Sequence, residues 1–512
     1  MLIAASPVPL SFPGGRDLVG ILPELVLGGA FLLLMLLDLV IPPSKRTWLA
    51  GFALFGVVAA FGVTIWAWFD ANPGRLVYSG SFAYDRFALF VDAILLVSAG
   101  LVVMISPNYL NRRGIHYGEY YALILAATLG MMLLAGATSL MVIFLAIELL
   151  SLALYVLSGF SRHEERSQEA ALKYLLLGGF ASGFLLFGMA LIYGETGHTQ
   201  LAQIAAAIQS QTTITVDPLL LAGVLLLFIG FAFKVSAAPF HSWTPDVYQG
   251  APTSVTTFMS VTTKVAAFAA LVRVFTYTFD GGGTHFYQHW EPVVALVAIT
   301  SMVVGNIAAL TQTSIKRMLA YSGIAQAGYI LIGVAVGPVL LPSGQTSSLG
   351  TIGVLYYLAA YAVSNIGAFA VITVMAGRGE DLDSYDGLRG LAHRRPFVAA
   401  SMALFLFSLG GFPPTAGFFG KFLVFTAAIN AGQMPLALWG IATSAVSAFY
   451  YLRVGLLMYQ RPAPGAEEYR WSRTGFSGTA VLVATTAGTL ILGVMIVLVY
   501  TAATASLKGL IV

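Results

Sequence analysis

The chain has 512 residues, of which 58% are hydrophobic and only 9% are charged, whereas soluble globular proteins carry about 25% charged residues. This composition excludes an ordinary soluble enzyme, and a net charge of only +3 gives no reason to expect a nucleic-acid partner. Cysteine is absent, which excludes thiolate-bound zinc, iron–sulfur clusters and disulfides.

Apolar runs of about 20 residues recur along the whole chain, and they are continuous rather than alternating. They predict an all-α polytopic membrane protein with about 14 transmembrane helices. The predicted spans are 21–41, 47–69, 86–106, 118–136, 138–160, 168–194, 217–247, 253–277, 291–312, 315–337, 350–376, 396–431, 435–459 and 475–503. The first run is long enough to cross the membrane and to remain as a transmembrane helix, so we expect no cleavable signal peptide. The polar segment 198–211 is expected to form a surface helix.

The distribution of lysine and arginine supports this count. With both termini outside, the inside loops hold 15 of the 25 basic residues, the outside segments hold 4, and 6 fall within spans. Basic residues concentrate in cytoplasmic loops, and a miscounted span would scramble the alternation. We therefore predict both termini on the outer side of the membrane.

Two of the predicted spans contain internal breaks. The seventh, 217–247, contains Pro239 and Pro245, and the twelfth, 396–431, carries GGFPPTAGFFGK at its middle. Proline removes a backbone donor and interrupts a helix. In a membrane the freed backbone groups are tolerated only inside protein or beside a water-filled cavity. Both spans are therefore predicted to be broken helices.

The two broken spans suggest an internal repeat. Each is the fourth member of a set of five spans, and Pro239 and Pro414 occupy matching positions. Because five is an odd number, the second set would run inverted through the membrane. The predicted parts are a three-helix segment (1–117), two five-helix repeats (118–277 and 278–459) and a C-terminal helix (460–512).

Four charged residues fall within the spans at similar depth. Glu148, Lys234 and Lys264 lie near the centres of the fifth, seventh and eighth spans, and Lys421 lies in the outer half of the twelfth. An ionisable residue in hydrocarbon costs at least ~2.5–3.5 kcal/mol and is a functional candidate by default. These four residues, called the charged line below, predict a polar path in the plane of the membrane.

The residue types of the charged line suit proton transfer. Burial and a neighbouring carboxylate act in opposite directions on the pKa of a lysine, so a Glu–Lys pair is adjustable. Separating Glu148 from Lys234 would release a proton, and His241 is a further candidate. The alternative is a static ion pair that holds helices together. Two mid-membrane lysines against one glutamate would leave a charge unmatched.

Other charged residues have a simpler interpretation. Lys173, Arg273 and Arg453 lie near span ends, where long basic side chains reach toward lipid headgroups. Glu24 and Asp92 are expected to be interfacial or structural.

At this point the motifs resemble a known family. FKVSAAPFHSWTPDVYQGAPTSV (233–255) with Lys264, KRMLAYSGIAQAGY (316–329) and LGGFPPTAGFFGKFLVF (409–425) are similar to the antiporter-like subunits of respiratory complex I, the proton-pumping NADH–quinone oxidoreductase (NDH-1). The combination looks most like the subunit N (chain 2) branch. A lysine at 421 argues against subunit M, and the long lateral helix of subunit L is missing.

The resemblance implies a proton-translocating subunit whose complex reduces quinone elsewhere. It implies that Glu148 is the charged partner, Lys234 the proton carrier, Lys264 the connecting lysine and Lys421 the terminal residue. No cofactor is expected in this chain, because NAD, FMN, iron–sulfur clusters and quinone belong to other subunits. The implied partners are another antiporter-like subunit and small helical subunits. The expected location is a bacterial cell membrane, or a thylakoid in a photosynthetic source.

Two other functions remain open from the sequence. A subunit of a multi-subunit cation/proton antiporter would share the ancestral fold. A free-standing secondary transporter would predict a mid-membrane pocket with several polar side chains, whereas the sequence shows mainly charges in a row.

Overall fold

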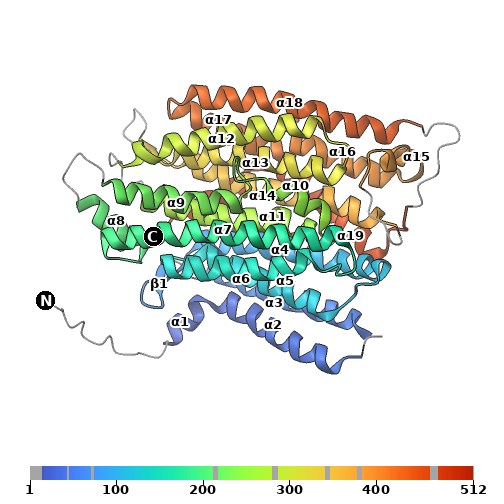
Figure 1. Ribbon diagram of the computed structural model, residues 1–512, viewed down its shortest axis with the longest axis horizontal. Helices are drawn as coiled ribbons and strands as arrows, with labels where there is room; N and C mark the ends of the chain where they lie inside the picture. The colour runs from blue at the N-terminus through green and yellow to red at the C-terminus, as the bar shows by residue number, and fades with distance from the viewer. Residues whose placement is uncertain are drawn as a thin grey trace.

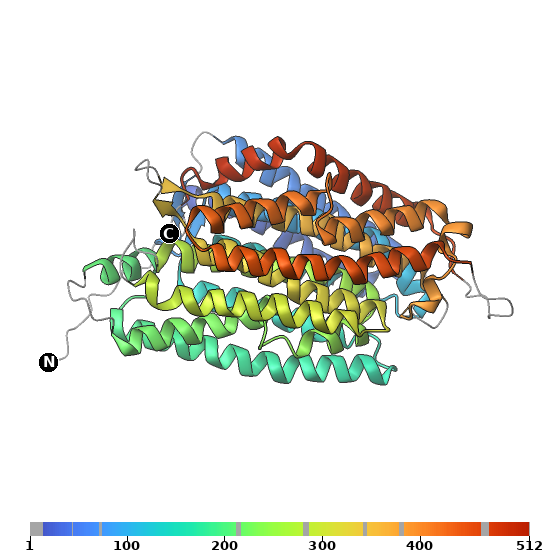
Figure 2. The ribbon, with the colours of Figure 1, turned by 90° about the horizontal axis from the view of Figure 1, so that it is seen from above.

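The computed structural model describes residues 14–42, 45–70, 74–210, 217–279, 286–340, 346–377, 383–461 and 471–510. Figures 1 and 2 show a bundle of long helices that run alongside one another. Twelve helices of the described residues are long and apolar enough to cross a membrane. They are α2 (Leu22–Val40), α3 (Thr47–Phe69), α4 (Arg86–Arg113), α5 (Gly118–Gly136), α6 (Leu140–Ser158), α7 (Glu165–Thr196), α11 with η2 (Thr253–Thr278), α12 (Tyr287–Leu310), α13 (Ile315–Val336), α14 (Leu349–Met375), α18 (Met434–Tyr459) and α19 (Phe476–Val494).

The two remaining predicted spans are broken helices, as the prolines indicated. The seventh consists of α9 (Pro218–Lys234) and α10 (Trp243–Gly250), and the twelfth consists of α16 (Pro396–Gly410) and α17 (Ala416–Asn430). The predicted all-α polytopic fold is therefore confirmed. The inverted relation between the two five-helix sets stays a prediction.

The last predicted span differs from the expectation of one continuous helix. It is divided into α19 and α20 (Ile496–Leu507) at Met495. Near this division Gly493 packs so closely on the break of the twelfth span that an added Cβ would lie 2.1 Å from the carbonyl oxygen of Pro414. No proline marks this division in residues 475–503, and the close packing partner comes from another span.

Short elements lie at the two ends of the bundle. In Figure 1, α1 (Gly15–Gly20), strand β1 (Arg75–Val77), α8 (Leu201–Ser210) and the C-terminus lie at the left end, and α15 (Leu391–Arg394) lies at the right end. Strand β1 pairs antiparallel with β2 (Phe82–Tyr84), and β3 (Val339–Leu340) pairs with β4 (Thr346–Ser347). A short 3-10 turn, η3 (Asp386–Leu388), precedes α15. Helix α8 occupies the segment predicted as a surface helix.

Helix α11 is the most enclosed element of the bundle. Every residue from Thr253 to Leu271 is buried, and the helix packs against α4, α5 and α14. Thr257, Thr262 and Thr263 each donate a hydroxyl hydrogen bond to the carbonyl four residues earlier, as in Thr257 to Thr253 O at 2.7 Å, so these hydroxyls need no water. By contrast, α7 and α18 expose large apolar side chains that suit lipid. The position of α11 places Lys264 at the protein interior.

Candidate functional site: a line of buried charges

Lys234 is the last residue of α9, at the edge of the first helix break. Its side chain is only 4% exposed, and its Nζ donates a hydrogen bond of 2.6 Å to Ser151 Oγ on α6. The ammonium also lies 5.7 Å from the ring centroid of Tyr155 and 5.9 Å from that of Tyr174. Aromatic faces attract a cation by their quadrupole. The break therefore ends α9 where a hydroxyl and aromatic rings surround the charge.

Glu148 lies on the same helix as Ser151, three residues before it. It accepts a hydrogen bond of 2.5 Å from Ser182 Oγ on α7 and interacts electrostatically with Lys234. Among the described ion pairs none joins Glu148 directly to Lys234; Ser151 binds the lysine instead. Glu148 therefore acts on Lys234 through an electrostatic interaction, whereas the group that binds the lysine directly is the Ser151 hydroxyl.

Lys264 in α11 is 0% exposed. Its Nζ is 3.4 Å from Ser236 Oγ and 3.3 Å from the hydroxyl of Tyr248. Ser236 lies in the break between α9 and α10, only two residues after Lys234. The break itself therefore links the two lysines, and it does so with the backbone of Ser236 in the left-handed region at φ 64°.

A polar network that the sequence analysis missed extends from α13 to the second broken helix. Gln326 donates a hydrogen bond of 2.8 Å to the carbonyl of Leu409 and one of 3.2 Å to the hydroxyl of Tyr451. Its Oε1 accepts from Tyr357, and Tyr451 also binds Ser322. A signal was present, because Ser322 and Gln326 lie four residues apart on one face of an otherwise apolar span.

This network begins beside Lys264. A Cβ added to Gly323 on α13 would lie 3.6 Å from Lys264 Nζ and 3.2 Å from the hydroxyl of Tyr361. Gly323 adjoins Ser322, so α13 passes directly from Lys264 to Gln326. Polar groups thus occupy the stretch between the third and fourth members of the charged line.

Lys421 lies in α17, after the second break. It is 4% exposed, and its Nζ donates to the carbonyl of Gly410 at 3.0 Å and to Ser444 Oγ of α18 at 2.7 Å. The ring of Tyr329 lies 4.5 Å from the nitrogen. The Gly410 carbonyl is at the end of α16, where the break has freed it from helical bonding. The break therefore supplies an acceptor for the charge.

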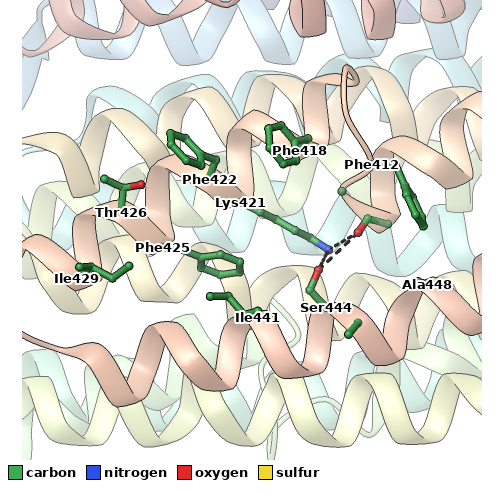
Figure 3. Close-up of a pocket in the computed structure, with 13 residues that line it drawn as sticks. Phe412, Phe418, Lys421, Phe422, Phe425, Thr426, Ile429, Ile441, Ser444 and Ala448 are labelled. Carbon is green, nitrogen blue, oxygen red and sulfur yellow. Dashed lines mark hydrogen bonds between the residues drawn. The ribbon is translucent and has the colours of Figure 1, made fainter.

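A cavity of about 450 Å³ adjoins Lys421. Figure 3 shows the lysine pointing between α17 and α18 toward Ser444, with Phe418, Phe422 and Phe425 along the other walls. The lining is mostly apolar, so the lysine, Ser444 and the Gly410 carbonyl are its main polar features. This end of the charged line therefore has a cavity beside its lysine.

His241 lies in the turn between α9 and α10 and is partly exposed. Among the described contacts, no hydrogen bond joins its ring to Lys234 or Lys264, and its Nδ1 is buried without a partner. Glu148 and the three lysines therefore each lie beside polar side chains in the protein interior, whereas His241 has no described contact with Lys234 or Lys264.

The expectation for Arg273 was wrong. Its side chain is 0% exposed, and it forms a two-pronged ion pair with Asp85 at 2.9 and 3.1 Å instead of reaching toward lipid headgroups. Lys173 is partly exposed and pairs with Asp246 at 2.6 Å and with Glu169 at 2.7 Å. The pairs with Asp85 and Asp246 depend on carboxylates from other parts of the chain, which a single span does not reveal.

Comparisons with known proteins show the family of the chain. Residues 137–447 match the family described as NADH:quinone oxidoreductase/Mrp antiporter, TM. NADH-quinone oxidoreductase subunit N of Trichlorobacter lovleyi is 44% identical over 93% of this chain and 94% of its own length. The chain belongs to the subunit N family of NADH-quinone oxidoreductases. The resemblance in the sequence motifs is thereby confirmed.

Two solved structures contain chains with the same fold as this member of the subunit N family. A chain of respiratory complex I from Thermus thermophilus has a TM-score of 0.76 and 33% identity, and the match covers 94% of this chain and 99% of that one. A chain of the Mrp complex from Dietzia has a TM-score of 0.78 at 22% identity, covering 96% and 97% of the two chains. The second likeness shows a shared fold alone.

Proposed function

We propose that the chain is the proton-translocating subunit N of a membrane-bound NADH–quinone oxidoreductase. Protons would move along Glu148, Lys234, Lys264 and Lys421, and quinone would be reduced elsewhere in the complex. The observation that carries this proposal is that each member of the charged line has a serine hydroxyl partner. The pairs are Glu148–Ser182, Lys234–Ser151, Lys264–Ser236 and Lys421–Ser444.

Serine is suited to this position because its hydroxyl both donates and accepts hydrogen bonds. When a lysine is charged, the serine accepts from it; when the lysine is neutral, the hydroxyl can turn and donate to it. A static structural ion pair needs a carboxylate partner, whereas the three lysines of the charged line bind hydroxyls and a carbonyl. This pattern favours proton exchange over the static alternative.

The two helix breaks would give the path its adjustable points. Ser236 in the first break contacts Lys264, and Gly410 at the second break contacts Lys421. A change in either break would alter the partners of a lysine without unpacking a whole helix. Burial makes this effective, since an unpartnered charge in the interior costs several kcal/mol.

The finer points of the assembly are also proposals. Another antiporter-like subunit and small helical subunits would be the protein partners, and NAD, FMN, iron–sulfur clusters and quinone would be bound by other subunits. Both termini would face the outside of a bacterial cell membrane. A division at residues 117, 277 and 459 into a three-helix segment, two repeats and a C-terminal part agrees with the order of the helices.

A role in a multi-subunit cation/proton antiporter is the alternative. The fold is shared with the Mrp chain, so fold does not separate the two functions. Sequence identity favours subunit N, because the subunit N of Trichlorobacter lovleyi is 44% identical over 93% of this chain. An antiporter subunit would need sodium or potassium for proton movement, and the proposed subunit would not.

The test measures NADH-driven acidification in membrane vesicles that contain the assembled complex. Lys234→Ala and Glu148→Ala are expected to reduce proton pumping strongly, with Lys45→Ala and Glu165→Ala as exposed controls that leave it unchanged. Subunit content checks assembly in each case. Normal pumping by both Lys234→Ala and Glu148→Ala would overturn the proposal, and a strict requirement for sodium would support the antiporter alternative.

A further inference from the structure

Two acidic side chains are buried in the N-terminal helices, outside the charged line. Glu24 in the first turn of α2 is 4% exposed, and Asp92 in α4 is 0% exposed. Both side chains are therefore enclosed by protein and do not face lipid or water. A buried carboxylate is expensive unless it is paired or hydrogen-bonded, so both positions require an explanation.

Neither carboxyl is satisfied by the protein groups around it. Among the described residues, both oxygens of Asp92 and the Oε2 of Glu24 are buried without a hydrogen-bond partner. The two side chains interact electrostatically with each other. Two carboxylates that share a buried site cannot both stay ionised cheaply.

The helices between them offer no compensating cation. Helices α3 and α5 each pack against both α2 and α4. Their sequences contain no lysine, arginine or histidine. A further acidic residue that acts on Asp92, Asp85, is already neutralised by the two-pronged pair with Arg273.

The other basic side chains at this end of the bundle are engaged elsewhere. Arg75 lies over the ring of Tyr84 at 5.1 Å, and Arg86 lies over the ring of Trp68 at 5.8 Å. Tyr78 and Tyr84 are the further titratable groups that interact with Glu24. None of the described ion pairs includes Glu24 or Asp92. The described contacts therefore give Glu24 and Asp92 no cationic partner.

We infer that Glu24 and Asp92 form a second proton-binding site, in which one of the two buried carboxyls carries a proton. The proton removes one of two buried negative charges, which are costly when they are not paired. A divalent cation is a poorer occupant, because it needs about six or more oxygen ligands. Among the described residues no group of three or more His, Asp or Glu side chains could hold a metal.

Infrared spectra of the assembled complex at neutral pH test this inference. The spectrum of wild type is compared with those of Asp92→Asn and Glu24→Gln. At least one variant is expected to lose a carbonyl stretching band of a protonated carboxylic acid. The control is Asp17→Asn, whose carboxylate accepts hydrogen bonds from the backbone of Gly14 and Tyr78, and it should lose carboxylate bands only.

Each outcome decides the question. Loss of the acid band in one variant alone supports the site and identifies the residue that carries the proton. An unchanged acid band in both variants means that both groups are ionised and overturns the inference. Failure of both variants to assemble would also overturn it, because an amide imitates a protonated acid but not a carboxylate. The spectra are taken at rest, so they do not depend on the pumping proposed for the charged line.

Discussion

The Nζ of Lys234 lies 2.6 Å from Ser151 Oγ, and Ser151 follows Glu148 by three residues on the same helix. The carboxylate and the serine therefore point from nearly the same face of α6 toward the end of α9. A hydroxyl, rather than a direct ion pair, holds the lysine. The interaction between Glu148 and Lys234 can then change with a small movement of either helix.

Removing the Ser151 hydroxyl should slow pumping. Hydrogen bonds to charged groups are worth about 1.5–3 kcal/mol, and each 1.4 kcal/mol corresponds to roughly tenfold in rate. Ser151→Ala is therefore expected to lower NADH-driven pumping about tenfold. Ser158→Ala is a matched control, because Ser158 is also buried on α6 and binds the carbonyl four residues earlier, but contacts no lysine. Equal pumping by the two variants would show that the Ser151 hydroxyl takes no part in proton transfer.

Tyr357 and Tyr356 are adjacent on α14 and test the network around Gln326. The hydroxyl of Tyr357 donates to Gln326, whereas that of Tyr356 donates to the carbonyl of Leu492 at 2.5 Å. Each Tyr→Phe change leaves a buried acceptor short of one donor and should cost about 1–3 kcal/mol of stability. Only Tyr357→Phe is expected to reduce pumping. Pumping losses of the same size in both variants would indicate a structural role alone.

Glycine is needed at position 411 because of its backbone conformation and because the side chain of Lys421 lies beside it. Its φ is +83°, and an added Cβ would lie 2.9 Å from Lys421 Cδ. Gly432 has a similar φ of +77° with nothing within 4 Å of an added Cβ. Alanine at either site should cost about 1–2 kcal/mol of backbone strain, measured by thermal unfolding. Gly411→Ala should in addition displace Lys421 and reduce pumping, and pumping as strong as in Gly432→Ala would contradict this.

The Arg273–Asp85 pair should be a strong stability determinant. Removing one partner of a buried pair costs about 3–5 kcal/mol, because the other charge stays buried and unpaired. Arg273→Met is therefore expected to lower the melting temperature of the purified complex, and Asp85→Asn/Arg273→Met should recover part of the loss. Asparagine can keep the cap that Asp85 provides to the Ala88 amide. A double variant less stable than the single one would show that the pair is not coupled.

The spans and both proline breaks could be predicted because each depends on residues within one stretch of the chain. Apolar runs set the helices, and Pro239 and Pro414 mark the breaks. The serine partners could not be predicted, because Ser151, Ser182 and Ser444 come from other helices and serine is common in apolar spans. The burial of Arg273 was missed for the same reason: Asp85 lies in a distant loop.

The division of the last span at Met495 could not be predicted for the same reason. Gly493 has no distinguishing local pattern, and its close approach to Pro414 depends on the packing of two distant spans. The candidate residues Glu148, Lys234, Lys264 and Lys421, by contrast, were found from charge and depth, and their individual roles were implied by the family resemblance. They remain proposals that the variants above address.

The enclosure of α11 has a consequence for isotope exchange. Lys264 is surrounded by protein on every side of its helix, so its ammonium hydrogens have no direct route to bulk solvent. Deuterium can reach them through the hydroxyls of Ser236 and Tyr248, which bind the lysine. The rate at which Lys264 acquires deuterium would therefore report proton exchange with its neighbours inside the protein rather than direct exchange with the solvent.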